Sequence, residues 1–544
     1  MREHKLLIAI IILFVFLGLA GVRYGLPLWL VEDEPPYILA ALKMIQLRTF
    51  LPVLHMSDFQ PFLYYPPYLS FLFLPFFLLL TLWKLWIFNS DISLFPLYIA
   101  ANTSVFFVIA RVVILLGGSF AVWGVYKASQ NIFKDKMAAL ASSFFLATSV
   151  TFLALSMTSR QWAPLAIILV AAFYCLTVKD WSFRKRYFFA ILILSVGMGV
   201  NVVAALGLFL AVFWYIFYEK RSFFAALKDY FSYVLLLVFL GLALLPNLIY
   251  PASLGFKGGT TLLQSKSLAD FLWSPFKFIV YLARMELVLI LFSTIGAVVA
   301  FRKKKKYILP IILFLAFYGF VFFLFFDQER YRFVLPLVPF LALIAGYGFS
   351  FLQGSFGNKY LKIILYVFLA LPVLTSLQLA VLVWRDDSRI QARDWVERNI
   401  PVGAKVAVLA PQMRISANKS SEEELKKINP NSWRKIDEAE SRFDGNPFYP
   451  SFHALNLYTV YDSVFFKNLE SYLYENEYEY IVISSDFKRA MPNLNMSDLS
   501  LKASFGTDTG KYSFTQSRFE GFFWDFWSLA NLGPEIFIYE IKDK

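Results

Sequence analysis

The sequence predicts an α-helical protein that crosses a membrane many times and carries a soluble α/β domain at its C-terminus. Of its 544 residues, 59% are hydrophobic and 19% are aromatic, whereas soluble domains are about 45–50% apolar. Many apolar runs reach the roughly 20 residues that a helix needs to cross a bilayer. Beyond residue 384 the charge density rises and the apolar runs shorten to strand and helix lengths. We therefore expect a membrane domain at 1–384 and a soluble domain at 385–544.

The first span is the uncharged run 6–20, which follows the charged start of the chain. We interpret it as a retained anchor with a cytoplasmic N-terminus, although its flanks also suit a cleaved signal peptide. Glycines and an asparagine at 197–201 divide the long run 187–218 into two short spans. The further apolar runs lie at 66–88, 97–126, 136–157, 161–178, 187–218, 230–250, 279–301, 307–326, 333–353 and 359–384.

Positive charge in the loops sets the expected topology. The net charge of +13 falls largely in short connections, which is the bias of cytoplasmic loops and argues against a nucleic-acid partner. All these loops share one side if the run 66–88 lies along the interface, as its Trp83, Lys84 and Trp86 suggest. About 11 transmembrane helices then result, with an external loop at 25–97 that contains interfacial helices and an external C-terminal domain. The basic connections are 127–136, 179–186, 220–221 and 302–306.

The tail has the pattern of an α/β domain. Residues 387–399 and 465–476 have helical spacing, and residues 405–409 and 480–484 predict strands. The polar stretch 411–450 predicts a long loop or short helices. The chain has one cysteine, Cys175, so an intramolecular disulfide is impossible. This favours a prokaryotic cytoplasmic membrane over a eukaryotic secretory lumen.

The strongest signal for chemistry is the acidic cluster Glu32-Asp33-Glu34, just beyond the first span. Ionised groups beside hydrocarbon are costly and usually persist because function requires them. The residues from Pro35 to Met44 predict a short amphipathic helix with prolines in its first turn. Periodicity leaves a second interpretation open, in which Asp33 and Glu34 merely cap this helix.

Several cations and aromatic residues complete the candidate site. Arg111 lies inside a span, so it needs a partner, either an acid on another helix or a phosphate. Arg330 and Arg332 lie at the outer mouth of a later span, where they suit either an external anion or interfacial snorkelling. Arg160 is a further external cation, and the stretch 65–68 (Tyr-Pro-Pro-Tyr) opens the interfacial segment. No phosphate loop, zinc-ligand spacing or nucleophile elbow is visible.

At these residues the chain resembles the GT-C polytopic glycosyltransferases. Within them it is similar to glycosyltransferase family 39, which comprises protein O-mannosyltransferases and the aminoarabinose transferases of lipid A modification. Asp33-Glu34, followed by Tyr37 and Lys43-Met44, resembles the acidic motif of the family's first loop. The residues 65–69 resemble its Pro-Pro segment, although Tyr65 stands where the family often has histidine or lysine.

Three further segments carry the same resemblance. Arg111 resembles the arginine that opens the next span, and Arg330-Tyr331-Arg332 resembles a late Arg-Tyr element of the family. The residues 387–401 resemble the helix that opens the external domain in many prokaryotic members. The resemblance extends over residues 1–410 and is weak beyond them.

The resemblance implies a GT-C fold and an inverting transfer of one sugar from a polyprenyl-phosphate donor on the external membrane face. The acceptor would be a protein hydroxyl, a lipid or a glycan. Asp33 would be the general base and Glu34 would position the site. The donor phosphate would be held by Arg111, Arg160, Arg330 and Arg332, and the site would be lined by Tyr37, Tyr65, Pro66, Pro67 and Tyr68.

The chemistry of these residue types agrees with that reaction. A carboxylate activates a hydroxyl nucleophile, and fixed cations stabilise a leaving phosphate. The sequence assigns no cofactor, and it leaves a divalent metal open without supporting one. The expected partners are the lipid-linked donor, an acceptor that the sequence does not name and membrane lipids, with no nucleic acid. A flippase or transporter of lipid-linked sugars and a non-catalytic membrane scaffold are the alternatives.

Overall fold

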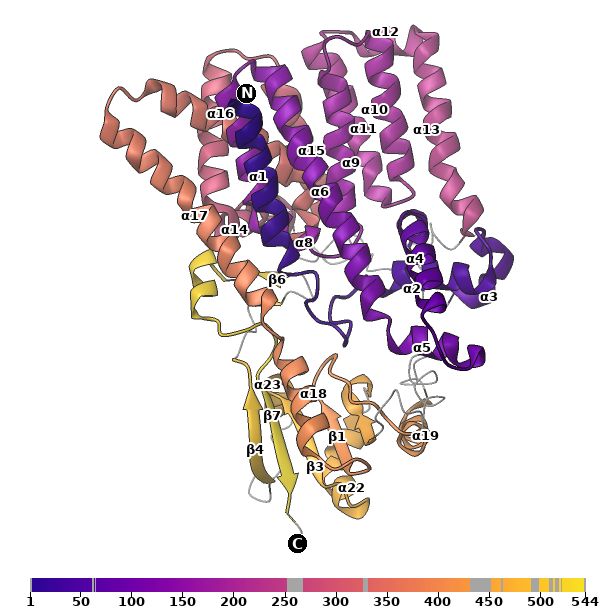
Figure 1. Cartoon of the computed structure of the whole chain (residues 1–544). Coiled ribbons are helices and arrows are strands. Elements are labelled where there is room, and N and C mark those ends of the chain that lie inside the picture. The colour runs from indigo at the N-terminus through magenta and orange to yellow at the C-terminus, as the bar shows by residue number, and fades with distance from the viewer. Residues whose placement is uncertain are drawn as a thin grey trace.

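The computed structural model describes residues 2–60, 63, 65–251, 268–325, 331–430, 452–460, 463–490, 499–507, 512–513, 518–519 and 521–542. Long helices form a bundle at one end of the molecule, and a domain built around a β-sheet forms the other end (Figure 1). The N-terminus lies at the end of the bundle remote from the C-terminal domain. We call the opposite end of the bundle, which faces that domain, the domain side.

Apolar helices of the bundle run between its two ends. In the described residues, six helices are long and apolar enough to cross a membrane, or up to eight if each bent pair is one span. The predicted fold class, a polytopic helical membrane protein with a C-terminal α/β domain, is confirmed, whereas the figure of about 11 crossings stays a prediction. The bundle comprises α1 (Arg2–Leu19), α6 (Ser104–Phe133), α7 (Lys136–Ala147), α8 (Val150–Ser156), α9 (Trp162–Thr177), α10 (Phe183–Gly197), α11 (Gly207–Phe213), α13 (Tyr230–Ile249), α14 (Leu268–Arg302), α15 (Ile308–Phe325), α16 (Val338–Ser355) and α17 (Lys359–Trp384).

Breaks in the helices follow local chemistry. The run 187–218 is divided as expected, because α10 ends at Gly197 and the Asn201 side chain caps the 3₁₀-helix η3 (Val202–Leu206). The run 136–157 is also divided, into α7 and α8 at an angle of 58°. The Ser149 side chain caps α8 there, and the buried Glu286 carboxylate accepts hydrogen bonds from Ser149 Oγ (2.6 Å) and the Thr151 amide (2.8 Å). Polar groups therefore replace the backbone hydrogen bonds that the bend removes.

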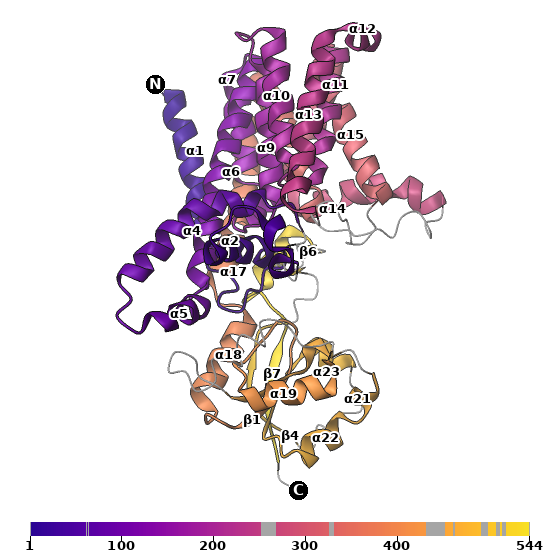
Figure 2. The ribbon, with the colours of Figure 1, turned by 90° about the vertical axis from the view of Figure 1, so that its right-hand side faces the viewer.

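Short helices of the first loop lie across the domain side of the bundle (Figures 1 and 2). The helix α4 passes the length and composition test for a span. It nevertheless runs obliquely away from the bundle in Figure 2, as an interfacial segment would. The elements are α2 (Pro35–Leu47), η1 (Pro52–His55), α3 (Met56–Phe59), α4 (Tyr68–Trp86), η2 (Ile92–Leu94) and α5 (Phe95–Ala101).

The C-terminal domain contains a five-stranded sheet of order β2-β1-β3-β7-β4. The strands β1 (Lys405–Leu409), β2 (His453–Asn456) and β3 (Tyr480–Ser484) are parallel. The strands β7 (Ile536–Ile541) and β4 (Leu499–Phe505) continue the sheet in antiparallel pairing. Both predicted strands have the expected bounds. Alternate residues of β1 and β3 enter separate cores on the two faces of the sheet, which explains their continuous apolar runs.

Helices cover the sheet and connect its strands. The predicted helix at 387–399 forms as α18 (Ser388–Asn399), with Asp387 as its N-cap. The predicted helix at 465–476 is divided into α21 (Ser463–Lys467) and α22 (Leu469–Glu475). Part of the predicted loop 411–450 forms α19 (Lys419–Ile428), whereas residues 431–450 lie outside the described residues. The remaining elements are η4 (Trp214–Tyr218), α12 (Phe223–Lys228), η6 (Tyr331–Phe333), η7 (Leu335–Leu337), η9 (Leu457–Thr459), α23 (Ser485–Ala490), β5 (Tyr512–Ser513), β6 (Arg518–Phe519) and η11 (Phe523–Ser528).

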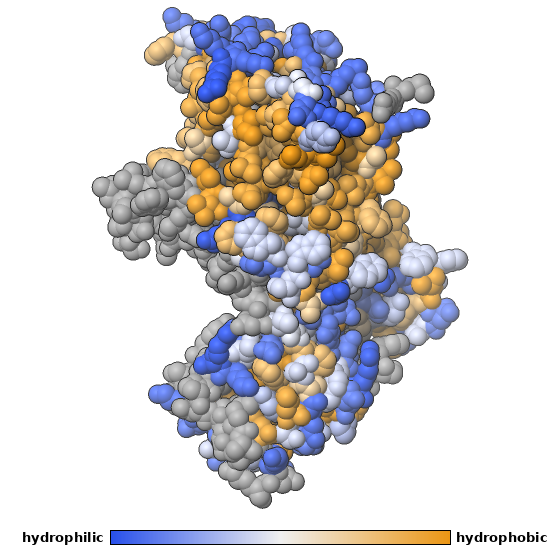
Figure 3. Space-filling model, turned by 90° about the vertical axis from the view of Figure 1, so that its left-hand side faces the viewer, coloured by the Kyte–Doolittle hydropathy of each residue, from blue (hydrophilic) through white to orange (hydrophobic). Residues whose placement is uncertain are grey.

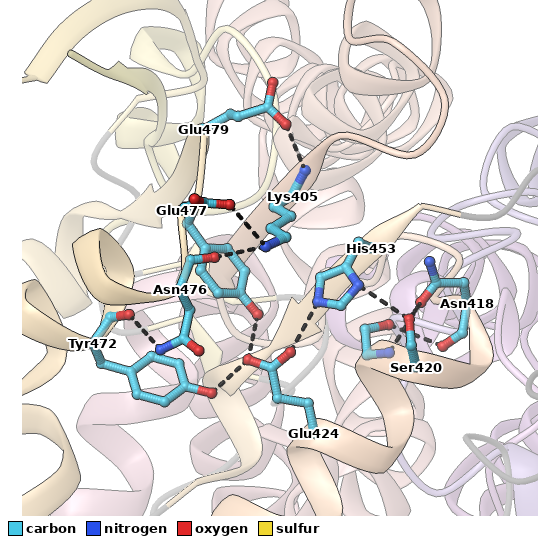
Figure 4. A network of polar contacts seen from close by, with 11 residues as sticks. Lys405, Asn418, Ser420, Glu424, His453, Tyr472, Asn476, Glu477 and Glu479 are labelled. Atoms are coloured by element: carbon cyan, nitrogen blue, oxygen red, sulfur yellow. Dashed lines mark hydrogen bonds and ion pairs between the residues drawn. The ribbon is translucent and has the colours of Figure 1, made fainter. Parts of the chain in front are cut away.

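A polar network attaches α19 to the edge of the sheet (Figure 4). The Glu424 carboxylate accepts hydrogen bonds from the hydroxyls of Tyr472 and Tyr478, the latter at 2.7 Å, and lies 2.8 Å from His453 Nε2. His453 Nδ1 lies 3.2 Å from Ser420 Oγ. Burial raises the pKa of Glu424, but the hydrogen bonds from the two tyrosines and His453 outweigh burial and hold that pKa below its ordinary value.

Candidate active site

The acidic cluster lies in a sharp turn that leads into α2. Pro35 and Pro36 occupy the first turn of α2, as predicted, because proline needs no amide hydrogen there. Asp33 has a φ of 66°, a left-handed conformation that aspartate tolerates better than most residues. Glu34 is the N-cap residue, but its side chain makes no capping hydrogen bond. The structure therefore contradicts the interpretation in which Glu34 merely caps a helix.

Asp33 contacts a cation and a tyrosine from distant segments. Its Oδ1 accepts a hydrogen bond from Tyr65 Oη (3.0 Å), and its Oδ2 accepts one from Arg332 Nη1 (2.7 Å). Asp33 and Arg332 are 299 residues apart in the sequence. Their side chains keep 16% and 11% of their exposure. This pair is therefore within reach of solvent.

Glu34 forms a buried ion pair with Arg111. The Arg111 guanidinium donates to the carboxylate from Nε (3.1 Å) and Nη2 (2.6 Å). Its Nη1 donates to the carbonyls of Val22 (3.0 Å) and Tyr24 (2.7 Å). Both charged side chains are completely buried. Of the two partners that the sequence allowed for Arg111, the structure shows the acid, and the phosphate-binding role stays a prediction.

Three successive residues of the turn between α8 and α9 hold the acidic stretch and the start of α2. The Ser159 amide donates to Glu34 Oε1 (2.7 Å), Arg160 Nε donates to the Glu32 carbonyl, and Gln161 Oε1 accepts from Tyr37 Oη (2.8 Å). Arg160 is fully buried. The sequence singled out Arg160 alone in this turn, because a backbone amide such as that of Ser159 leaves no trace in residue type.

Of the predicted lining residues, Tyr65 contacts Asp33 directly. Tyr37 and Tyr65 stack with their ring centroids 5.5 Å apart. Pro66 and Pro67 are buried next to Tyr65, and the Tyr68 amide donates to the Gly199 carbonyl (3.1 Å). The structure thus brings the Pro-Pro segment against the break between α10 and α11. Of the remaining predicted residues, Arg330 lies outside the described residues.

A chain of polar side chains joins this site to the C-terminal domain. Gln412 donates from Nε2 to Glu32 Oε1 (2.9 Å) and accepts from Arg389 Nη1 (3.0 Å). Arg389 in turn forms a bidentate pair with Asp387 (2.7 and 2.8 Å), and Tyr24 Oη donates to the same carboxylate (2.6 Å). The sequence analysis did not predict this bridge, because its members come from segments far apart in the chain.

The charges divide into an enclosed group and an accessible group. Glu34, Arg111 and Arg160 have no exposed surface, whereas Asp33 and Arg332 retain some. The enclosed charges can fix the backbone, and the accessible pair can meet a reactant. Within the described residues, no group of three or more histidine, cysteine, aspartate and glutamate side chains is arranged to hold a metal ion.

No protein-family model and no curated protein matches the sequence. Solved structures similar to this chain include ArnT from Cupriavidus metallidurans bound to undecaprenyl phosphate, with 12% identity, a TM-score of 0.49 and coverage of 98% of this chain and 97% of that chain. The apo oligosaccharyltransferase of Archaeoglobus fulgidus has 14% identity, a TM-score of 0.47 and coverage of 89% and 70%. The mycobacterial arabinofuranosyltransferase AftD has 13% identity, a TM-score of 0.39 and coverage of 84% and 35%. All three are GT-C glycosyltransferases, the class that the sequence motifs resemble, and similarity at this level says nothing about the substrate of this chain.

Proposed function

We propose that this protein is a glycosyltransferase that takes one sugar from a polyprenyl-phosphate donor and transfers it, with inversion, to a hydroxyl or phosphate acceptor. The observation that carries the proposal is the contact between Asp33 and Arg332, a carboxylate and a guanidinium that remain accessible at the domain side of a membrane bundle. A base and a phosphate-binding cation are the two groups that this reaction needs.

Each group has a defined part in the proposed reaction. Asp33 accepts the proton of the acceptor, whose oxygen forms a bond to the anomeric carbon of the sugar. The bond from that carbon to the phosphate oxygen breaks, and its electron pair leaves with the lipid phosphate. Arg332 stabilises the charge that develops on this phosphate, because guanidinium binds phosphate oxygens bidentately. Glu34 acts through Ser159 and Arg111 and is a positioning residue.

The 2.7 Å contact between Asp33 and Arg332 implies a first step before chemistry. An inverting displacement needs the sugar between the base and the leaving group, and a sugar does not fit within a hydrogen-bond distance. We infer that the donor phosphate displaces the Asp33 carboxylate from Arg332. Tyr65, which also bonds Asp33, then keeps the released carboxylate in the site.

The reaction would take place on the external face of a prokaryotic cytoplasmic membrane. The N-terminus, α12 and the polar surface at the top of Figure 3 all lie at the end of the bundle remote from the C-terminal domain. The basic connections 179–186, 220–221 and 302–306 join helices at this same end. Loops rich in lysine and arginine stay in the cytoplasm, which supports an external position for Asp33 and for the C-terminal domain.

The test is Asp33→Asn, with Asp58→Asn as the matched control. Asp58 also lies in the first loop, where it pairs with Lys43 (3.3 Å) and contacts none of the site residues named above. Purified full-length variants in lipid nanodiscs would be incubated with a panel of undecaprenyl-phosphate monosaccharides and a membrane extract as the source of acceptor. Released undecaprenyl phosphate would be measured by mass spectrometry.

We expect Asp33→Asn to abolish release while binding of added undecaprenyl phosphate persists, and Asp58→Asn to match the wild type. Full release by Asp33→Asn would refute the general-base role. No release from any donor by the wild type, together with no binding of undecaprenyl phosphate, would refute the proposed function itself.

A further inference from the structure

One segment of the C-terminal domain packs against the membrane bundle instead of against its own sheet. The residues 521–532 precede β7, yet Phe526 and Leu532 are fully buried in the hydrophobic core of the bundle and in neither core of the sheet. Gln378 of α17 donates from Nε2 to the Phe526 carbonyl (3.0 Å). Phe523 lines a small cavity together with residues of α17 and α14, among them Pro372.

The opposite face of this segment presents large aromatic side chains. Phe522, Trp524 and Trp527 are 44%, 49% and 54% exposed. The rings of Phe522 and Trp524 stack with centroids 4.4 Å apart. The η11 turn is held by hydrogen bonds from the Phe522 amide to Asp525 Oδ2 (3.0 Å) and from Ser528 Oγ to the Asp525 carbonyl (2.7 Å). We call the residues 522–527 the aromatic loop.

The aromatic loop lies near the level at which α17 leaves the hydrocarbon. This helix has 26 residues and is about 39 Å long at 1.5 Å per residue, whereas the hydrocarbon core is about 30 Å thick. Gln378, which binds the loop, precedes the helix end at Trp384 by roughly 9 Å along the axis. In Figure 1 the loop is the yellow segment beside the lower part of α17.

The surface around the aromatic loop is continuous with the surface that faces lipid. Exposed apolar side chains of α17 near Gln378 include Leu374, Leu377, Val381 and Trp384. Figure 3 shows the broad apolar band of the bundle directly above the region where the bundle meets the C-terminal domain. A bilayer that covers this band would extend toward the loop.

We infer that the aromatic loop inserts into the headgroup region of the bilayer and anchors the C-terminal domain to the membrane surface. Tryptophan concentrates at this depth because its ring is apolar and its indole N–H bonds water or headgroups. The Arg284 guanidinium of α14 lies 6.0 Å from the centre of the Phe522 ring, so the loop is also held from the bundle side. The aromatic loop then attaches the domain to the membrane in addition to the end of α17 and the Gln412–Glu32 contact.

The test uses the full chain in vesicles of phosphatidylethanolamine and phosphatidylglycerol. Cys175, the one cysteine of the sequence, is first replaced in a Cys175→Ser background. Trp524→Cys and Trp527→Cys then carry a nitroxide spin label, and Leu501→Cys is the matched control. Leu501 is 54% exposed on β4, a strand of the sheet far from the bundle in Figure 1.

At positions 524 and 527, oxygen should relax the label more strongly than a water-soluble nickel complex does, and this order should reverse at position 501. Stronger relaxation by nickel at 524 and 527 would overturn the inference, as would dipolar broadening that reports a second copy of the chain against the loop. If the cysteine variants fail to fold, Trp524→Phe with Trp527→Phe replaces them. Lipids brominated near the headgroup should quench a smaller fraction of the tryptophan fluorescence in that variant than in the wild type. An unchanged quenched fraction would overturn the inference equally.

Discussion

Glu34 and Asp33 are neighbours in the chain, but they should respond very differently to the loss of their charges. Glu34→Gln leaves the Arg111 guanidinium without a counter-charge in a site that has no exposed surface. Asp33→Asn changes a pair that keeps 16% and 11% exposure, and the new amide oxygen still accepts a hydrogen bond from Tyr65 or Arg332. The first substitution should therefore act mainly on folding, whereas under the proposed function the second should act mainly on chemistry.

The magnitudes follow from the burial of each pair. Removing one member of a buried ion pair costs about 3–5 kcal/mol, because the other charge stays desolvated. Glu34 also accepts the Ser159 amide, and this bond survives as a weaker one to the glutamine oxygen. For Asp33→Asn we expect a loss of about 1 kcal/mol, since the ion pair becomes a hydrogen bond from Arg332 to a neutral amide in a partly solvated site.

The assay is unfolding in mixed detergent micelles, with SDS as denaturant and helical circular dichroism as the signal. Glu34→Gln should lower the free energy of unfolding by several times more than Asp33→Asn does. The double variant Glu34→Gln with Arg111→Met removes both charges and should regain part of the loss. Equal losses of unfolding free energy in Glu34→Gln and Asp33→Asn would refute the reasoning. It would also be refuted if adding Arg111→Met to Glu34→Gln lowered the stability as much as Arg111→Met lowers it in the wild type.

Three other substitutions probe the bridge, the packing and the domain. Gln412→Ala removes the contacts to Glu32 and Arg389, so amide hydrogen exchange should become faster at residues 29–34. The control Gln391→Ala loses one exposed contact to Asp386 and should leave that exchange unchanged. Gly199→Ala would place a Cβ 2.1 Å from the Tyr68 ring and should lower the free energy of unfolding by about 1–3 kcal/mol. The control Gly241→Ala has open space around its Cβ and should be neutral or stabilising in the same SDS titration. Hydrogen bonds hold the pKa of Glu424 below its ordinary value. The stabilisation of the folded state by the Glu424 carboxylate is therefore complete above about pH 4.3, and it is lost as pH falls through the lower pKa of the folded state. Thermal unfolding followed by near-ultraviolet circular dichroism should therefore lose stability in that acidic range, and Glu424→Gln should flatten this dependence.

Local chemistry made much of the fold predictable. The strands at 405–409 and 480–484 were found because both faces of each are buried, which produces an uninterrupted apolar run. The break near Gly197 was found because glycine and asparagine disfavour helix. The bend between α7 and α8 was missed, because its capping groups, Ser149 and the distant Glu286, resemble ordinary polar residues within apolar runs.

The acidic residues of the candidate site could be predicted from the sequence, whereas the residues that they contact could be predicted only in part. The acids at residues 32–34 can be recognised from the sequence alone, because they directly follow a membrane-spanning apolar run. The sequence allowed two partners for Arg111, an acid or a phosphate. The structure shows the guanidinium enclosed and paired with Glu34. The Gln412 bridge depends on how the C-terminal domain docks, which no local pattern encodes.

The three acids of the cluster bind three different parts of the molecule, and the backbone explains how. Glu32 meets Gln412 of the C-terminal domain, Asp33 meets Arg332 beyond α15, and Glu34 meets Arg111 inside the bundle. The left-handed conformation of Asp33 (φ 66°) turns the chain between its two neighbours, so that successive side chains diverge. Glu32 and Glu34 are each held by a distant segment, and the residue between them is fixed on both sides while its own carboxylate stays accessible. A residue in this position can change its partner without a movement of the backbone, which is what the displacement of Asp33 from Arg332 by a donor phosphate requires.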